Sequence, residues 1–407
     1  MVRYILATAV LLGALFLSAC QDVFGTKEDD SVKEVFEEGN IDPNLNPQNV
    51  GYVPIQPVWE GFVEPTDVYG GYDEMIYVTD KNGVHVLDQK GEEHRVIAIP
   101  GAKDVVQDRR LHLYVIGTID REINGEMKTL SAVYRISNTA TNGDVVYHDT
   151  IIHPFSDISR RNTSFRSEDE EVEFTGVAPT YDNRIYVSRR GPRNNESSTS
   201  RPDNTVLIFD KEGNNTSYAR GLSPNTSNLK SVIGISGIAN EAGPPQEVFG
   251  IPETENFAYC QTTMNGNVPE FGVLYITVVY NPESGVSYES TPGLTEFDKG
   301  KAKRFLYDAY RFKSPEDICF APDRRHIFVV DSELDSLYQF TIGGEEGVTP
   351  PANSTEKRNI IVSFGGEGDG PFQFKDPSGV CYLRKTLFVA DKGNNRVLRY
   401  QLNTDLE

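Results

Sequence analysis

The sequence predicts an all-β fold: a six-bladed β-propeller of four-stranded antiparallel blades, closed by a strand from the N-terminal side. The chain of 407 residues contains 35 Gly and 23 Pro, which favours many short strands and turns over long helices. One order of short strand, turn, second strand, loop and third strand recurs along it. The spacing is about sixty residues, as four-stranded propeller blades require.

Residues 1–19 are predicted to be a signal peptide. Arg3 precedes an uncharged apolar stretch from Tyr4 to Leu17, which is too short to be a comfortable membrane span. Small residues then precede Cys20, and LSAC at 17–20 resembles the lipobox of bacterial lipoproteins. An ordinary signal peptide with an incidental cysteine is the alternative.

The lipobox resemblance implies cleavage before Cys20 and acylation of both its thiol and the new amino terminus. More than one acyl chain is what stable anchoring requires. We therefore expect a lipid-anchored protein of the bacterial cell envelope, at the outer membrane or cell surface and outside the cytoplasm. Residues 20–49, acidic and then rich in Asn and Pro, are predicted to be a flexible tether. The propeller then takes residues 50–407.

The blade pattern is clearest at 364–402, FGGEGDGPFQFKDPSGVCYLRKTLFVADKGNNRVLRYQL. A Gly-rich lead-in, a Phe before a Pro, a short strand, FVAD and a GNN turn follow one another, with Arg396 before Val397. This order resembles the NHL repeat, and it recurs at Ser314–Ile342 and Val63–Asp88. The resemblance implies a six-bladed propeller similar to NHL-repeat proteins over about residues 50–403.

The remaining copies are more divergent. In the three clear copies the second strand ends at Asp80, Asp331 and Asp391, and the last two set the period. Three further units fit the same strand order. They lie at 102–137, 174–211 and 235–280. The stretch 212–310 is long enough to leave a seventh blade as the alternative count.

Ring closure is predicted from the two ends of the repeat region. The last copy contains three strands, so one outer strand is missing. Val50–Phe62 alternates enough to be a strand. We expect it to pair as the outer strand of the last blade, where it would protect an open edge.

Charge limits the possible partners. The chain carries 39 basic and 60 acidic side chains, a formal net charge of -21. This balance argues against nucleic acid as a partner and against electrostatic docking on anionic lipid. An anchor at Cys20 needs no basic patch, and we expect a monomer.

The sequence contains no complete catalytic set. None of the six His occurs in a motif such as HExxH, and Cys260, Cys319 and Cys381 show no CxxC spacing. The three thiols are predicted to be buried core residues. His85 and His112 are interpreted as hydrogen-bonded sheet residues.

Resemblance to NHL-like lyases and to related lactonase propellers implies an alternative: a metal in the central channel. Asp67, Asp104 and Asp317 recur on the predicted innermost strands, and three carboxylates around one channel could bind Ca²⁺. The other interpretation is that they cap turns or accept backbone amides. Otherwise no cofactor is expected.

Long loops predict where a ligand would bind. Blades 2, 3 and 4 carry insertions between their second and third strands, at Thr118–Thr129, Arg189–Asp203 and roughly Pro252–Pro269. Topology places all three on one face, and long loops on a rigid scaffold often bind ligands. The candidate residues are Arg189, Arg190, Arg193, Phe257 and Tyr259.

The three Arg form a local basic cluster on an acidic protein, and guanidinium groups suit a carboxylate or an acidic glycan. The two aromatic rings could supply stacking area. The alternative is that the insertions have no binding role.

Two functions remain. The first is a membrane-anchored extracytoplasmic scaffold that binds protein, peptide or polysaccharide through the loops of blades 2–4, as NHL propellers often do. The second is a metal-dependent lyase or lactonase-like hydrolase with a carboxylate metal site in the channel.

Overall fold

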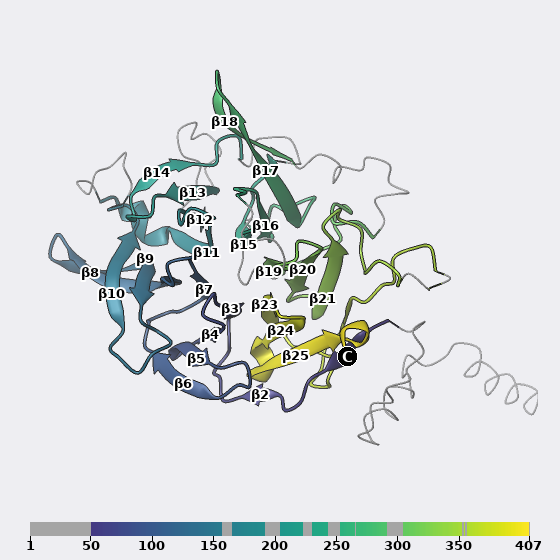
Figure 1. The fold of residues 1–407 in the computed structure, drawn as a ribbon. Helices are drawn as coiled ribbons and strands as arrows, with labels where there is room; N and C mark the ends of the chain where they lie inside the picture. The colour runs from purple at the N-terminus through teal and green to yellow at the C-terminus, as the bar shows by residue number, and fades with distance from the viewer. Residues whose placement is uncertain are drawn as a thin grey trace, which may run out of the picture. The chain divides into compact units, whose positions relative to one another are not determined.

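The computed structural model describes residues 50–156, 165–191, 204–222, 230–242, 253–264, 266–290, 304–351, 354 and 356–406. Within them, six four-stranded antiparallel blades surround a central axis, as Figure 1 shows. The predicted fold class is confirmed. Residues 1–49, including Cys20 and the predicted tether, lie outside the described part of the chain.

Each blade uses consecutive strands, with the innermost strand first. Blade 1 contains β3 (Asp67–Gly70), β4 (Ile76–Asp80), β5 (Gly83–Leu87) and β6 (Glu93–Ile97). Blade 2 contains β7 (Asp104–Gln107), β8 (Leu113–Ile123), β9 (Glu126–Ser137) and β10 (Val146–Ile152). Blade 3 contains β11 (Glu173–Pro179), β12 (Ile185–Arg190), β13 (Thr205–Phe209) and β14 (Asn215–Tyr218).

The second half of the ring repeats this order. Blade 4 contains β15 (Ile235–Asn240), β16 (Phe257–Gln261), β17 (Val273–Asn281) and β18 (Gly285–Ser290). Blade 5 contains β19 (Pro315–Phe320), β20 (His326–Asp331), β21 (Ser336–Thr341) and β22 (Phe364–Gly365). Blade 6 contains β23 (Pro377–Leu383), β24 (Thr386–Asp391) and β25 (Arg396–Leu402). The described residues of 212–310 thus supply blade 4 and the last strand of blade 3.

The N-terminal segment closes the ring. β1 (Tyr52–Pro54) and β2 (Trp59–Glu60) both pair antiparallel with β25, and Figure 1 shows this purple segment beside the yellow β25. The predicted pairing is therefore confirmed. The Tyr52 hydroxyl also donates to Gln339 Oε1 of blade 5 at 2.7 Å, and the Arg399 guanidinium lies 4.5 Å from the centre of the Trp59 ring.

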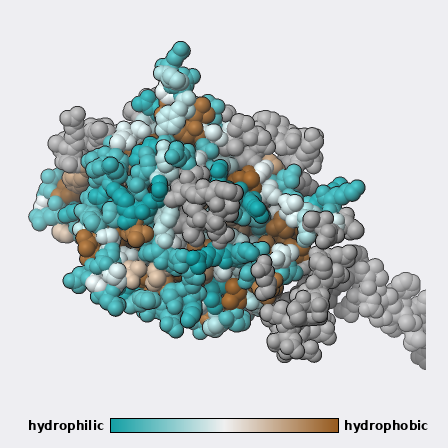
Figure 2. All heavy atoms as spheres, in the orientation of Figure 1, coloured by the Kyte–Doolittle hydropathy of each residue, from teal (hydrophilic) through white to brown (hydrophobic). Residues whose placement is uncertain are grey.

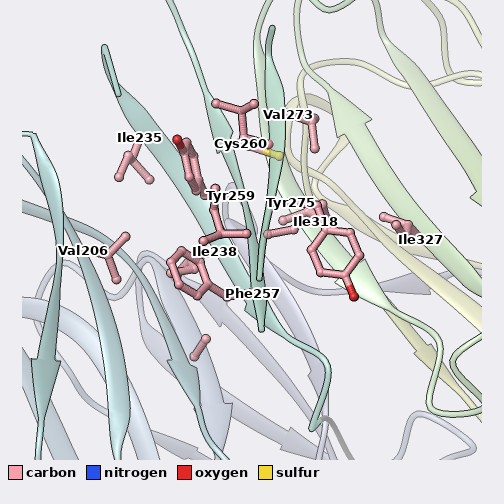
Figure 3. Packing of buried hydrophobic residues seen from close by; sticks show 14 of the residues in the cluster. Val206, Ile235, Ile238, Phe257, Tyr259, Cys260, Val273, Tyr275, Ile318 and Ile327 are labelled. Carbon is pink, nitrogen blue, oxygen red and sulfur yellow. The ribbon is translucent and has the colours of Figure 1, made fainter. Parts of the chain in front are cut away.

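The core lies between neighbouring blades. Figure 3 shows one cluster, in which Ile238 and Phe257 of blade 4 pack between Val206 of blade 3 and Ile318 of blade 5. Middle strands such as β4, β5, β13 and β16 are buried at every position, because each sheet is covered on both faces. The exposed surface is largely hydrophilic, with small apolar patches, as Figure 2 shows for one face.

The recurring aspartate at the end of the second strand has a structural role. Asp80, Asp331 and Asp391 are fully buried. Each accepts a backbone N–H from the segment that leads into its own blade, from Val63, Lys313 and Lys375 at 2.7–2.8 Å. The aspartate therefore fixes the entering chain to the second strand, which explains why it marks the period. No helix among the described residues has the length and apolar content to cross a membrane.

Deleting residues 50–60 should destroy cooperative unfolding. The deletion removes both strands that cover β25, so blade 6 would expose an edge and the ring would open. Thermal denaturation followed by circular dichroism measures the effect. A deletion within 22–48 serves as the control and should melt like the wild type. An unchanged melting temperature for the 50–60 deletion would contradict this account of closure.

Candidate functional site

The six innermost strands surround an axial channel. At the face where these strands begin, the channel opens into a cavity of about 240 Å³, which we call the channel mouth. All six blades contribute to its lining. Its hydroxyl groups come from Thr66, Thr175, Ser236 and Ser378, and its rim charges from Lys103, Glu173, Arg190, Glu316 and Lys392.

β-bulges direct side chains into the channel mouth. In β11, β15, β19 and β23 the register with the second strand shifts at Thr175, Ser236, Glu316 and Ser378. A bulge leaves one residue outside the ladder and re-aims its side chain. Each of these four residues lines the mouth. Thr66 and Lys103, which immediately precede β3 and β7, take the same position in blades 1 and 2.

The floor of the channel mouth consists of Asp67, Asp104 and Asp317. Asp67 accepts the N–H of Val105 at 2.9 Å, and Asp104 accepts that of Val177 at 2.5 Å. Asp317 in the same way accepts the N–H of Val380 at 2.8 Å. Each carboxyl group thus bonds to the innermost strand of the next blade. The structure brings the three predicted residues to one channel, where their oxygens contact backbone amides.

Burial raises the pKa of all three floor carboxyl groups above the usual range for aspartate. The neighbouring Asp67 raises the pKa of Asp104 further, and these two side chains share a hydrogen bond. One proton held between Asp67 and Asp104 satisfies both the burial and this hydrogen bond. The floor is therefore less anionic than its composition indicates.

Hydroxyl groups make the complementary bonds to backbone carbonyls. Ser378 donates to the Pro65 carbonyl at 2.8 Å, and Ser236 donates to the Pro315 carbonyl at 2.5 Å. Glycine follows each of these serines because the next blade approaches closely. A Cβ at Gly379 would lie 2.6 Å from the Cα of Asp67. The lining of the mouth therefore also joins the blades.

The charged rim is arranged in pairs. Glu173 lies between Lys103 and Arg190, and Arg190 Nε donates to it at 2.7 Å. Burial acts to raise the pKa of Glu173, but the Arg190 hydrogen bond and the two positive charges bring it below its ordinary value. Lys392 pairs with Asp376 at 2.8 Å, and Glu316 accepts hydroxyl protons from Ser314 and Ser332.

Below the aspartate floor the channel narrows and becomes largely apolar. A cavity of about 70 Å³ continues there, lined in part by Val106, Ala178, Cys319 and Cys381. Cys381 Sγ accepts the N–H of Gly70 at 3.0 Å. Burial raises the pKa of the Cys319 and Cys381 thiols. The three cysteines of the described region are free; Cys260 and Cys381 are buried and Cys319 is half-buried.

The predicted arginine cluster is only partly within the described residues. Arg190 ends β12 and lines the channel mouth. Arg189 is buried in the same strand, with 6% of its surface exposed. Arg193 lies outside the described residues.

The prediction that Phe257 and Tyr259 offer a stacking surface is wrong. Both are fully buried in β16, and the Tyr259 hydroxyl donates to the Ser231 carbonyl at 2.9 Å. The predicted insertion at Pro252–Pro269 contains this strand, so the loop between the second and third strands covers only 262–272. Thr118–Thr129 is likewise an extension of the β8–β9 hairpin instead of an open loop.

Sequence reasoning missed most of the rim. Lys103, Glu173, Glu316 and Lys392 are distant in sequence and meet only at the channel mouth. Two of them, Lys103 and Glu316, occupy the residue before the recurring Asp of the innermost strand, which was the available signal. Within the described region no group of three or more His, Cys, Asp or Glu is arranged to hold a metal ion. A ligand role for the three floor aspartates stays a prediction.

No family model and no curated protein sequence matches this chain. Solved structures resemble it in fold. A PQQ-bound aldose sugar dehydrogenase from Streptomyces coelicolor has a TM-score of 0.47 at 11% identity, covering 88% of this chain and 99% of that one. An auxiliary nutrient binding protein from Bacteroides ovatus ATCC 8483 has a TM-score of 0.46 at 10% identity, covering 87% and 77%.

A streptogramin B lyase has a TM-score of 0.40 at 10% identity, covering 87% of this chain and 97% of that one. These similarities concern the propeller architecture, which hosts many activities.

Replacing Asp104 by Asn should flatten the dependence of stability on pH. A raised folded-state pKa means that the carboxyl contributes stability below its unfolded pKa of about 3.9 and loses it as pH rises through the folded pKa. Asn still accepts from Val177 and donates to Asp67 but cannot ionise. The melting temperature of Asp104→Asn should therefore rise relative to that of the wild type as the pH increases from about 4 to about 8.

Two controls accompany this measurement. Asp104→Ala loses the bond to Val177 and should be destabilised by about 1–3 kcal/mol across the range. Glu212→Gln, at an exposed turn, should keep the wild-type pH profile. Parallel profiles for Asp104→Asn and the wild type would contradict a raised pKa for Asp104.

Proposed function

We propose that this chain is a lipid-anchored binding protein of the bacterial cell envelope, whose channel mouth takes the end of a peptide or polysaccharide. One observation carries the proposal. Side chains from all six blades line a single cavity with hydroxyl, cationic and anionic groups. A rigid scaffold with convergent polar groups is the usual form of a binding site.

The size of the mouth favours a chain end over a whole ligand. Its volume of about 240 Å³ lies below the roughly 300–1,000 Å³ typical of sites that enclose small molecules. The cavity that continues beyond the aspartate floor has only about 70 Å³, which favours entry of a chain end over passage of a polymer. One sugar unit or one terminal amino-acid residue fits such a space.

The rim offers exchangeable partners for a charged chain end. A ligand carboxylate can take the place of Glu173 beside Lys103 and Arg190, or of Asp376 beside Lys392. A ligand ammonium group can approach Glu316. Guanidinium geometry suits carboxylates, and Arg190 is the one member of the predicted arginine cluster that lines the mouth.

The N-terminal end of the described propeller lies on the face opposite the channel mouth. β25 begins at the mouth face beside Asp391 and ends at Leu402 on the opposite face. Tyr52 pairs with Leu402, so the chain enters the propeller on the face opposite the channel mouth.

Removing the rim cations should weaken ligand binding at least about tenfold, which is about 1.4 kcal/mol. Calorimetry of the full chain against a panel of soluble polysaccharides and of peptides with free termini measures this. The variants are Lys103→Ala with Arg190→Ala, and Lys392→Ala. Lys211→Ala and Lys385→Ala, at exposed lysines outside the mouth, are the matched controls.

Two results would contradict the binding function. In the first, no member of the panel binds the wild-type chain. In the second, the rim variants bind as tightly as the wild type, which would place the ligand elsewhere.

Replacing Cys20 by Ser should release the protein from the membrane fraction. Without a thiol the chain cannot carry the thioether-linked lipid that the lipobox resemblance implies. Metabolic labelling with palmitate and fractionation in a bacterial host measure both effects. Cys319→Ala should keep the label. A labelled, membrane-bound Cys20→Ser variant would remove the anchor from this account.

A further inference from the structure

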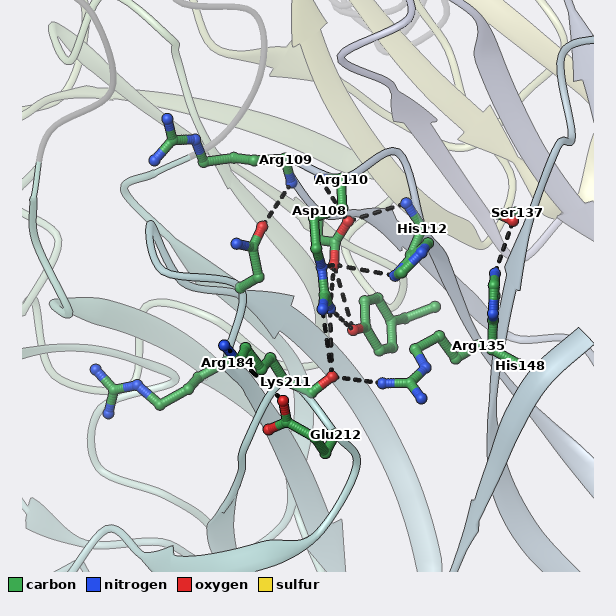
Figure 4. A network of polar contacts seen from close by, with 12 residues as sticks. Asp108, Arg109, Arg110, His112, Arg135, Ser137, His148, Arg184, Lys211 and Glu212 are labelled. Atoms are coloured by element: carbon green, nitrogen blue, oxygen red, sulfur yellow. Dashed lines mark hydrogen bonds and ion pairs between the residues drawn. The ribbon is translucent and has the colours of Figure 1, made fainter.

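Two histidines of blade 2 lie in contact on the face opposite the channel mouth. His112 precedes β8, and His148 lies in β10, on the outer edge of the same blade. Their ring centres are 4.5 Å apart with an interplanar angle of 43°, and Figure 4 shows both rings beside Asp108 and Ser137. Positions 36 residues apart in sequence thus form one imidazole pair.

His148 is oriented by a hydrogen bond, because its Nε2 lies 2.7 Å from Ser137 Oγ. His112 Nδ1 faces the buried Asp108 carboxylate at 3.6 Å and makes no hydrogen bond among the described residues. Among the described residues, no hydrogen bond involves His112 Nε2 or His148 Nδ1. The tautomers that place protons on His112 Nδ1 and His148 Nε2 leave lone pairs on the other two nitrogens.

A β-bulge sets the position of His148. The register of β10 with β9 runs from Tyr147–Ile136 to Asp149–Arg135, so His148 is the extra residue of the bulged strand. A bulge re-aims a side chain and is over-represented at functional sites. Here it places an exposed histidine against a half-buried one.

The surrounding charges are already paired. Arg110 donates to Asp108 through Nε and an Nη, at 2.9 and 2.8 Å. Arg135 donates to the Lys211 carbonyl at 2.5 Å and lies 3.9 Å from Asp149.

We propose that His112 and His148 form a site for a divalent transition-metal ion. Neutral imidazole suits Cu²⁺, Ni²⁺ and Zn²⁺, and Cu²⁺ is bound most tightly in this series. In metal-binding histidines the second ring nitrogen is commonly held by a hydrogen bond, as Ser137 holds His148 here. Ser137 is the positioning residue, and water completes the coordination of the ion.

The test uses Cu²⁺ with the tag-free full chain. Equilibrium binding should show one saturable site, and electron paramagnetic resonance should report two imidazole nitrogens. His112→Ala and His148→Ala should each weaken binding by more than about tenfold and reduce the nitrogen signal to one. His148 is exposed, so its variant should keep the wild-type melting temperature even if His112→Ala folds poorly.

Two further variants separate the site from general histidine binding. His94→Ala, at another exposed histidine of the described region, should bind Cu²⁺ like the wild type. Ser137→Ala should weaken binding with both nitrogens still detected, and Mg²⁺ should not compete.

Three outcomes would overturn the proposal. The wild-type chain shows no saturable binding. Both His112→Ala and His148→Ala bind as the wild type does. Loss of His94 alone removes the signal. None of these outcomes bears on ligand binding at the channel mouth, which lies on the other face.

Discussion

The propeller depends on hydrogen bonds that pass from one innermost strand to the backbone of the next. Blade 1 bonds to blade 2 through Asp67, blade 2 to blade 3 through Asp104, and blade 5 to blade 6 through Asp317. Ser236 and Ser378 join blades 4 and 5 and blades 6 and 1. These bonds are buried near the axis, where an unmade bond would cost about 1–3 kcal/mol. They fix the spacing of the blades and hence the width of the channel.

The same interactions shape the candidate binding site. Side chains that join the blades also form the floor and wall of the channel mouth, so the site is built on strands instead of flexible loops. Burial raises the pKa values of the floor aspartates, which disfavours their charged forms. Free ionic character is left to the rim, where Lys103, Glu173 and Arg190 form exchangeable pairs. In the proposed function, the groups that join the blades lie deeper along the axis than the charged groups offered to a ligand.

The two faces of the ring have different chemistry. The mouth face presents the innermost strand starts of all six blades, whereas the opposite face receives the chain from the N-terminal side and holds the histidine pair of blade 2. β1 and β2 cover the outer edge of blade 6, so the segment that enters on this face also completes the sheet of that blade. A ligand at the mouth and a metal ion at the histidine pair would occupy separate surfaces.

The sequence by itself predicted the repeat, six blades with a seventh as the alternative, and the closing strand. The blade features are local: alternating strands, turn residues and an aspartate that binds the chain only a few residues before its own blade. The closing strand, which pairs across the two ends of the repeat region, followed from the missing fourth strand of the last copy. It failed at Phe257 and Tyr259, because a strand buried on both faces has no alternation to separate it from an apolar loop. Only the tertiary structure decided the rim of the channel mouth and the His112–His148 pair. Ring closure brings distant residues to one axis, and a single-residue bulge, which leaves no trace in hydrophobic pattern, decides where a side chain points.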